Sequence, residues 1–129
     1  VLHISEGLLE LGIIDTDLGD IIGENFDGRY RDFFMHGTGH LLGLDVHDVG
    51  GGRKGDDNPG PSLQPGMIVT VEPGLYFSKW RSDVSIPDKY AGIGIRIEDD
   101  ILITENGPEI ITKSCPKEIE DIEVLIRNK

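Results

Sequence analysis

Cysteine is nearly absent from the 129-residue sequence: Cys115 is the only one, so no disulfide can form within the chain. Basic residues are also few, with 12 Lys and Arg against 24 Asp and Glu, for a formal net charge of −12. Nucleic acids and anionic membrane surfaces attract clustered Lys and Arg, so neither is expected as a partner. A chain with one cysteine fits a reducing compartment, which predicts a cytoplasmic location.

Long apolar runs are also missing. No run approaches the ~18 residues of a membrane-spanning helix, and no signal peptide is recognisable. Glycine, in contrast, is abundant at 18 residues, about twice the usual ~7% share, which indicates tight turns and close backbone approaches. The chain begins with Val1 inside a segment of helical spacing, so we interpret it as a fragment of a longer protein.

The apolar pattern predicts helices, then strands, then a helix. We expect helices over residues 1–11, about 16–25 and 117–127, and strands over 67–71, 75–77, 93–98, 101–104 and 109–112. Gly12 is expected to end the first helix, and Asp15 or Thr16 to cap the second. Turns are expected at Asp99–Asp100 and Asn106–Gly107. The expected loops are 26–32, 50–64 and 78–90. This order predicts an α+β fold with a largely antiparallel sheet.

Three of the four histidines, His36, His40 and His47, lie within twelve positions and have glycines between them. Glycine lets a backbone fold tightly and lets a ligand come close. Neutral imidazole binds divalent transition metals and also transfers protons near neutral pH. A single histidine is more often an ordinary core or surface residue, but three interleaved with glycines favour a functional site.

Two glutamates are expected at strand ends. Glu72 follows the apolar segment 67–71 directly, and Glu98 closes the alternating segment 93–98. A carboxylate at the end of a buried strand needs a partner or a metal ion, although either glutamate alone could instead point into solvent. Arg96 lies two positions before Glu98, so both would project from one face of a strand, either as a surface ion pair or as part of a site.

Histidine nitrogen together with two carboxylates suits Mn, Fe, Co or Zn. A hydrolase with two adjacent metals needs carboxylates that bridge them, and Glu72 or Glu98 could bridge. Three ligands are too few for two ions. Asp56 and Asp57 are interpreted as solvated loop residues and not as additional ligands.

Three segments, in order, resemble the pita-bread metallopeptidases, the family that includes aminopeptidase P and prolidase. They are His36–Asp48, Pro65–Gly74 and Gly94–Asp99. The stretches Leu44–Gly50 and Gly92–Arg96 look most similar to bacterial Xaa-Pro aminopeptidases (aminopeptidase P). The resemblance implies a pita-bread (creatinase/aminopeptidase-like) fold with helices flanking the sheet. It also implies a metal-dependent aminopeptidase that releases the N-terminal residue from peptides with proline in the second position.

The same resemblance implies a site for two divalent metal ions, usually manganese, with cobalt, zinc and iron as alternatives. His40, Glu72 and Glu98 match the family's metal ligands, with Glu98 as the bridging one. The catalytic residues implied are His36 and His47, which would contact the substrate and stabilise the tetrahedral intermediate. Glu72 would accept a proton from the attacking water.

Arg96 is the fourth implied catalytic residue and would hold the hydrogen-bond network of the site. The family's two aspartate ligands lie well upstream of His40, and this chain is too short before His40 to contain them. We therefore expect residues 1–129 to be the C-terminal half of the catalytic domain, without the N-terminal domain and the first half. The fragment alone is expected to be inactive, and the parent protein is expected to be a homo-oligomer.

Two other functions remain open from the sequence. Prolidase shares the three segments but cleaves Xaa-Pro dipeptides. A metal-free relative such as creatinase, or a non-catalytic pita-bread binding module, would keep the fold without the metals; the presence of all three ligand positions argues against it. Methionine aminopeptidase matches His36–Asp48 less well than the proline-specific members do.

Overall fold

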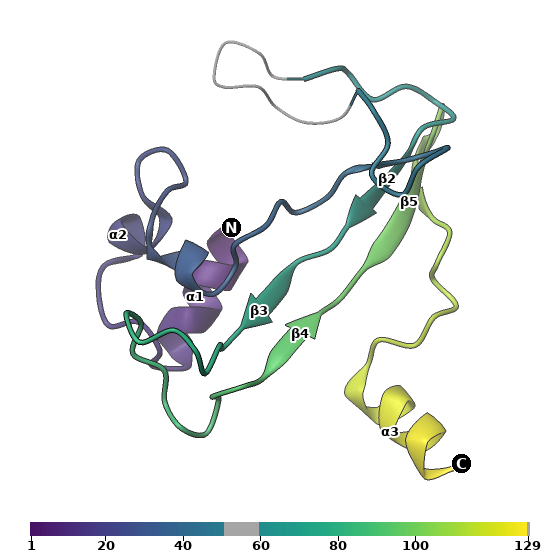
Figure 1. Cartoon of the computed structure of the whole chain (residues 1–129). Helices are drawn as coiled ribbons and strands as arrows, with labels where there is room; N and C mark the ends of the chain where they lie inside the picture. Colours follow the sequence, from purple (N-terminus) through teal and green to yellow (C-terminus); the bar gives the residue numbers. More distant parts are fainter. Residues whose placement is uncertain (51–59, 129) are drawn as a thin grey trace. The chain divides into compact units, whose positions relative to one another are not determined.

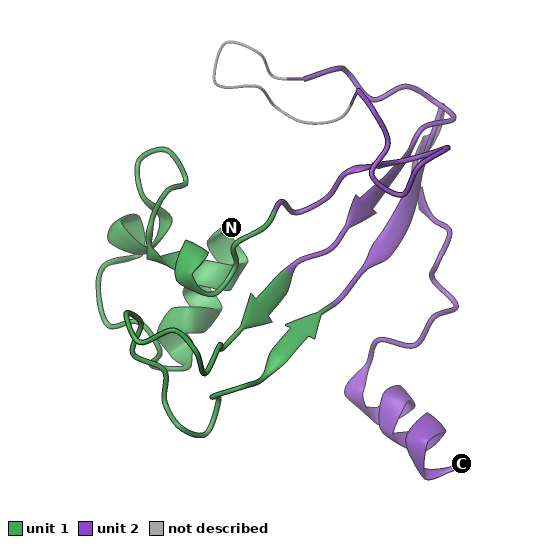
Figure 2. Ribbon diagram, viewed as in Figure 1, with its two compact units in different colours: residues 1–36, 74–96 green, residues 37–73, 97–129 purple. Residues whose placement is uncertain are grey.

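The computed structural model describes residues 1–50 and 60–128, which form two compact units (Figures 1 and 2). Unit 1 comprises Val1–His36 and Gly74–Arg96, and unit 2 comprises Gly37–Pro73 and Ile97–Lys129. Each unit therefore combines two stretches that are separated in the sequence. Of the loop expected over 50–64, residues 51–59, with Asp56 and Asp57, lie outside the described residues.

The helices of unit 1 come first in the chain: α1 (Leu2–Glu10), α2 (Leu18–Ile22) and the 3-10 helix η1 (Arg29–Asp32). Helix α1 ends as predicted, because Gly12 adopts a φ of 64°, in the left-handed region that favours glycine. Helix α2 is shorter than expected. It begins after Asp17 and not after Asp15 or Thr16, and Gly23, with a φ of 74°, ends it. The expected loop 26–32 contains η1.

The apolar core of unit 1 joins its helices to the segment that follows β3. Strands β3 (Gly74–Tyr76) and β4 (Gly94–Arg96) pair antiparallel. The rings of Phe33 and Phe77 pack with their centroids 5.5 Å apart. All the buried hydrophobic side chains among the described residues belong to this unit; they are Leu8, Ile13, Ile14, Ile21, Tyr30, Phe33, Phe34 and Phe77.

Unit 2 is a four-stranded antiparallel sheet followed by a helix. Its strands are β1 (Leu41–Leu42), β2 (Ile68–Val71), β5 (Asp99–Thr104) and β6 (Gly107–Ile110), in the order β1-β2-β5-β6. The two long central strands run side by side in Figure 1. The last element is α3 (Ile119–Arg127), whose apolar residues Ile119, Ile122 and Leu125 are all exposed.

The expected hairpin between 93–98 and 101–104 is wrong. Asp99 and Asp100 do not turn the chain but begin β5, where they lie opposite Val71 and Thr70 of β2. The Asp99 carboxylate is satisfied in this extended conformation, since it accepts hydrogen bonds from Thr112 Oγ1 at 2.7 Å and Lys117 Nζ at 2.8 Å. Strand β4 ends at Arg96, so Arg96 and Glu98 do not share a strand.

The second expected hairpin is confirmed, with a shift of one residue. Strands β5 and β6 pair from Thr104 opposite Gly107, so the two-residue turn is Glu105–Asn106. Gly107 opens β6 with a φ of 117°. Every strand pair among the described residues is antiparallel, as expected for the α+β class. None of the helices in the described part of the chain is long and apolar enough to cross a membrane.

Candidate metal site

Three of the predicted site residues come together in unit 2. His40, Glu72 and Glu98 each offer one ligand atom, and these atoms all lie within 4.8 Å of one another. Glu72 is buried, with 6% of its surface exposed, His40 is half-buried and Glu98 is exposed. The cluster therefore combines one carboxylate that is shielded from water, that of Glu72, with another that is open to solvent, that of Glu98.

The strand directions explain why residues so far apart in sequence meet. His40 directly precedes β1, Glu72 directly follows β2, and Glu98 directly precedes β5. In an antiparallel sheet, the start of one strand lies beside the end of its neighbour. Since β2 pairs with both β1 and β5, all three ligands are placed at the same edge of the sheet.

His40 is held against β2 by main-chain hydrogen bonds that continue the β1–β2 pairing. Thr70 N–H donates to His40 O at 2.9 Å, and Glu72 N–H donates to Thr38 O at 2.7 Å. This close approach requires glycine at position 39, because a Cβ there would lie 1.9 Å from Thr70 O. The glycine next to His40 thus lets the ligand segment lie directly on the strand that carries Glu72.

The hydrogen bonding of His40 determines which ring nitrogen can bind a metal. Nδ1 lies 3.0 Å from Leu41 O, and because a carbonyl can only accept, Nδ1 carries the proton. In the neutral ring, the lone pair is then on Nε2, which lies 3.2 Å from Glu72 Oε1. Two atoms that both carry lone pairs repel at this distance unless a proton or a cation lies between them. The pair of His40 Nε2 and Glu72 Oε1 therefore fits the binding of a divalent ion.

Thr70 was not predicted as a site residue, yet it contacts both ligands. Its Oγ1 accepts a hydrogen bond from His40 N–H at 3.0 Å and donates one to Glu72 Oε1 at 3.0 Å. The side chain is buried, with 4% exposed. Its position in the sequence could have indicated this role. Thr70 belongs to the expected strand 67–71 and lies two residues before Glu72, and residues two apart in an extended chain point to the same side.

Asp99 follows Glu98 directly but has a different role. Its hydrogen bond from Lys117, and then that from Thr112, hold the pKa of the Asp99 carboxyl below its ordinary value. The carboxylate oxygen Oδ1 is thereby committed to the segment that leads into α3. Of the two adjacent acidic residues, Glu98 is the one that reaches His40 and Glu72.

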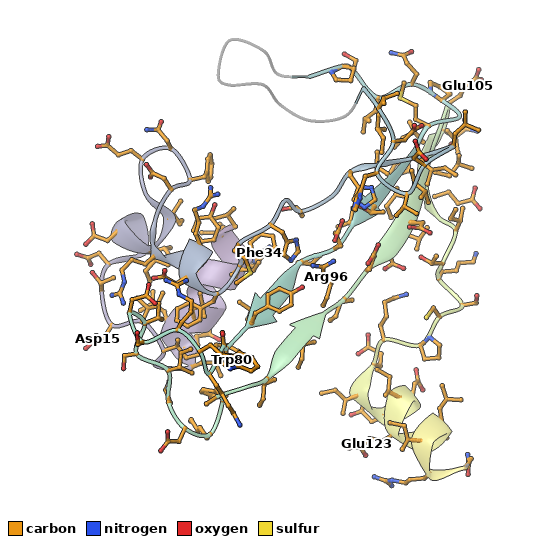
Figure 3. The ribbon with its side chains drawn as sticks, in the orientation of Figure 1. Asp15, Phe34, Trp80, Arg96, Glu105 and Glu123 are labelled. Atoms are coloured by element: carbon orange, nitrogen blue, oxygen red, sulfur yellow. The ribbon has the colours of Figure 1, made fainter. Side chains whose placement is uncertain are left out.

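The remaining predicted residues are divided between the units. In unit 2, the exposed His47 packs its ring edge-on against His40, with centroids 4.4 Å apart. In unit 1, His36 and Arg96 both reach the hydroxyl of Tyr76: His36 Nε2 lies 3.2 Å from Oη, and Arg96 Nε–H donates to it at 2.7 Å. Arg96, the last residue of β4, is labelled in Figure 3.

Tyr76 was expected only as part of an apolar strand. Its hydroxyl is nevertheless the group that His36 and Arg96 share, and the Arg96 guanidinium also lies 5.7 Å from the Tyr76 ring centroid. The sequence signal for it is weak, because tyrosine is common in strands for its packing alone. Strand β3 presents Tyr76 opposite Gly94, whose missing side chain leaves room for the ring.

Comparison with known proteins gives a consistent set of relatives. The model of metallopeptidase family M24 matches residues 6–105. An Xaa-Pro aminopeptidase of Haemophilus influenzae is 49% identical over 122 residues, which is 95% of this chain and 26% of that protein. An Xaa-Pro aminopeptidase of Escherichia coli is 52% identical over 120 residues, 93% of this chain and 25% of that protein.

A solved structure described as zinc-substituted E. coli aminopeptidase P in complex with product shares 50% identity with this chain. The TM-score is 0.79, and the match covers 97% of this chain and 26% of that chain. At this identity the likeness confirms the expected α+β, pita-bread (creatinase/aminopeptidase-like) fold. The chain spans about a quarter of the length of the relatives that it matches.

Proposed function

The chain belongs to metallopeptidase family M24, and from that premise we propose that it is part of a metal-dependent Xaa-Pro aminopeptidase. The reaction is release of the N-terminal residue from peptides with proline in the second position. The observation that carries the proposal is the cluster of His40, Glu72 and Glu98, with the free nitrogen of His40 turned toward the Glu72 carboxylate. Relatives at about half identity carry the name Xaa-Pro aminopeptidase.

We place the chain as the C-terminal half of a catalytic domain in a longer protein. The chain corresponds to about a quarter of its relatives' length. In addition, the buried hydrophobic side chains of the described residues all lie in unit 1, so the sheet of unit 2 lacks a closed core of its own. Such a sheet needs another layer to bury its apolar face.

The proposed cofactor is a pair of divalent ions, most simply manganese, with cobalt, zinc or iron as substitutes. One imidazole and two carboxylates suit all four. Three ligands do not complete two coordination shells, so the remaining carboxylates would come from outside this chain. Zinc in one of the related solved structures supports a site that accepts more than one metal.

The bound ions would supply polarisation of the scissile carbonyl and acidification of a water molecule. The residues of this chain would bind the ions and transfer the proton. Glu72, which is buried and accepts a hydrogen bond from Thr70, would accept the proton of the water. Glu98, the exposed carboxylate of the cluster, would be the third ligand, and the family resemblance makes it the candidate to be shared between the two ions.

Substrate contacts are assigned to the two histidines that do not bind metal. His47 lies against His40 and can donate to a developing oxyanion next to the cluster. His36 has its orientation set by Tyr76, whose hydroxyl is itself held by Arg96. Arg96 therefore acts through Tyr76 and positions His36 for the peptide.

Three further assignments belong to the longer protein. We propose a cytoplasmic location, supported by the single cysteine, and assembly as a homo-oligomer. The substrate is a peptide of three or more residues. Prolidase, which would cleave Xaa-Pro dipeptides, is the main alternative, and the names of the matched relatives favour the aminopeptidase.

The test is a comparison of three substrates on the full-length protein that contains this chain. After loading with Mn²⁺, hydrolysis of an Xaa-Pro-Xaa tripeptide, an Xaa-Pro dipeptide and a matched Xaa-Ala-Xaa tripeptide is measured. We expect fast cleavage of the first only, and loss of that cleavage with a chelator. Preference for the dipeptide would establish prolidase instead, and no cleavage with metal bound would establish a binding module.

A further inference from the structure

The hydroxyl of Thr70 lies between two of the candidate metal ligands. It is buried on β2, two residues before Glu72, which directly follows the strand. Thr70 Oγ1 is 3.0 Å from the main-chain nitrogen of His40 and 3.0 Å from Glu72 Oε1. One oxygen atom thus contacts the main chain of the first ligand and the carboxylate of the second.

The directions of these two hydrogen bonds follow from the chemistry of the partners. The His40 amide can only donate, so Thr70 Oγ1 accepts from it. The single hydroxyl proton then remains for Glu72 Oε1, which as a carboxylate oxygen can only accept. Both bonds are satisfied in one orientation of the hydroxyl, so the arrangement has no equivalent alternative.

The oxygen that Thr70 holds is also the one that faces His40. Glu72 Oε1 lies 3.2 Å from His40 Nε2. One hydroxyl therefore helps to fix the distance between these two ligand atoms, because it is hydrogen-bonded both to the main chain of His40 and to the carboxylate of Glu72. Loss of the hydroxyl would remove a hydrogen bond that orients Oε1 toward the imidazole.

We propose that Thr70 is a positioning residue for the metal site: its hydroxyl holds His40 and Glu72 in the arrangement that receives a divalent ion. The inference rests on the proposed function, since it concerns the same cluster. Partners that orient metal ligands typically change metal affinity by about 10-fold to 100-fold when they are removed. Thr70 acts through Glu72 and His40 and does not itself bind the metal.

Two pairs of variants isolate the hydroxyl. Thr70→Val keeps the shape of the side chain and removes its oxygen, whereas Thr70→Ser keeps the oxygen and removes a methyl group. Thr70→Ala, compared with Thr70→Ser, again differs only in the oxygen, and provides the same comparison if Thr70→Val does not fold. Thr104→Val is the matched control, because Thr104 Oγ1 donates to Gly107 O in the β5–β6 hairpin.

The measurement is binding of Mn²⁺ alone to the metal-free full-length protein, by titration against a competing chelator. The visible absorption of the Co²⁺ form reports the coordination geometry. We expect Thr70→Val to weaken Mn²⁺ binding by about 10-fold to 100-fold and to change the Co²⁺ spectrum, with Thr70→Ser close to wild type. Thr104→Val should leave both readouts unchanged.

The outcomes separate this inference from the proposed function. If the wild-type protein binds no metal, both fail. If it binds metal and Thr70→Val binds equally well, with the same Co²⁺ spectrum, only the role of Thr70 is overturned. The role is also overturned if Thr70→Ser is as weak as Thr70→Val, because the hydroxyl would then not be the active group.

Discussion

Single hydrogen bonds decide the chemistry of the candidate site. The bond from His40 Nδ1–H to Leu41 O leaves Nε2 as the ligand atom, and the Thr70 hydroxyl orients the carboxylate that Nε2 faces. The histidines and glutamates could be selected from the sequence because their side chains bind metals. The roles of Thr70 and Tyr76 were harder to predict, because each depends on a partner far along the chain: His40 lies 30 positions from Thr70, and Arg96 lies 20 positions from Tyr76.

Removing the Tyr76 hydroxyl tests the link between His36 and Arg96. We expect Tyr76→Phe to lower kcat/KM of the full-length protein about 10-fold to 100-fold, the effect of losing one or two hydrogen bonds to charged or reacting groups. The metal content should stay at the wild-type level, because the bonds of Tyr76 run to His36 and Arg96.

Tyr90→Phe is the control for that variant, since Tyr90 packs its ring against Phe77 in the same unit. It should retain wild-type kinetics. Unchanged kcat/KM in Tyr76→Phe would show that His36 and Arg96 do not need the shared hydroxyl.

Ser5 offers a test of the core of unit 1. Its hydroxyl is fully buried in α1 and has no hydrogen-bond partner among the described residues. Ser5→Ala should raise the free energy of unfolding by about 1 kcal/mol, because alanine removes an unsatisfied polar group and has the higher helix propensity. Urea denaturation of the full-length protein measures it; a decrease in stability would mean that the hydroxyl has a partner in the full-length protein.

Among the elements, the edge where β1 and β5 begin and β2 ends carries the metal ligands. Strand β2 and the strand character of 101–104 were predictable from β-branched apolar residues. The start of β5 was not, because two adjacent aspartates are typical of turns. Asp99 belongs to a strand here since Lys117 and Thr112 satisfy its carboxylate, and both lie beyond the range of local patterns.

The close approach at Gly39 can be tested at the level of this sheet edge. Gly39→Ala places a Cβ 1.9 Å from Thr70 O, a main-chain atom, so the segment before β1 must move away from β2. We expect a loss of about 1–3 kcal/mol in the free energy of unfolding, together with weaker Mn²⁺ binding, because His40 moves with the segment.

Gly37→Ala is the matched control in the same segment. A Cβ at position 37 would meet only Gly39 O at 3.8 Å, an ordinary contact. Equal stability and equal Mn²⁺ affinity for the two variants would contradict the packing described for residue 39.

At the scale of the whole molecule, the chain has two units of unequal character. Unit 1 has a buried aromatic and aliphatic core, whereas the strand β5 of unit 2 is half-buried along its whole length and α3 exposes its apolar residues. The fold class and the family were predictable from three short segments of sequence. The division into units was not, because each unit is built from two distant stretches.

The isolated chain provides a prediction at this scale. We expect residues 1–129 alone to show no cleavage of Xaa-Pro peptides and only weak Mn²⁺ binding, because His40, Glu72 and Glu98 leave two ions with incomplete coordination. Calorimetric titration with Mn²⁺ and a peptidase assay check both parts. Tight binding of two ions with cleavage would show that the chain contains a complete site.

The most direct test of the central claim is the metal content of the full-length protein and of three variants. His40→Ala and Glu98→Ala each remove one ligand, and Glu109→Ala removes an exposed carboxylate from β6 as the control. After loading with Mn²⁺ and removal of free metal, we predict two ions per chain in the wild type and the control, and loss of metal and of Xaa-Pro-Xaa hydrolysis in both ligand variants. Full metal content in His40→Ala and Glu98→Ala would contradict the assignment of this sheet edge as the metal site.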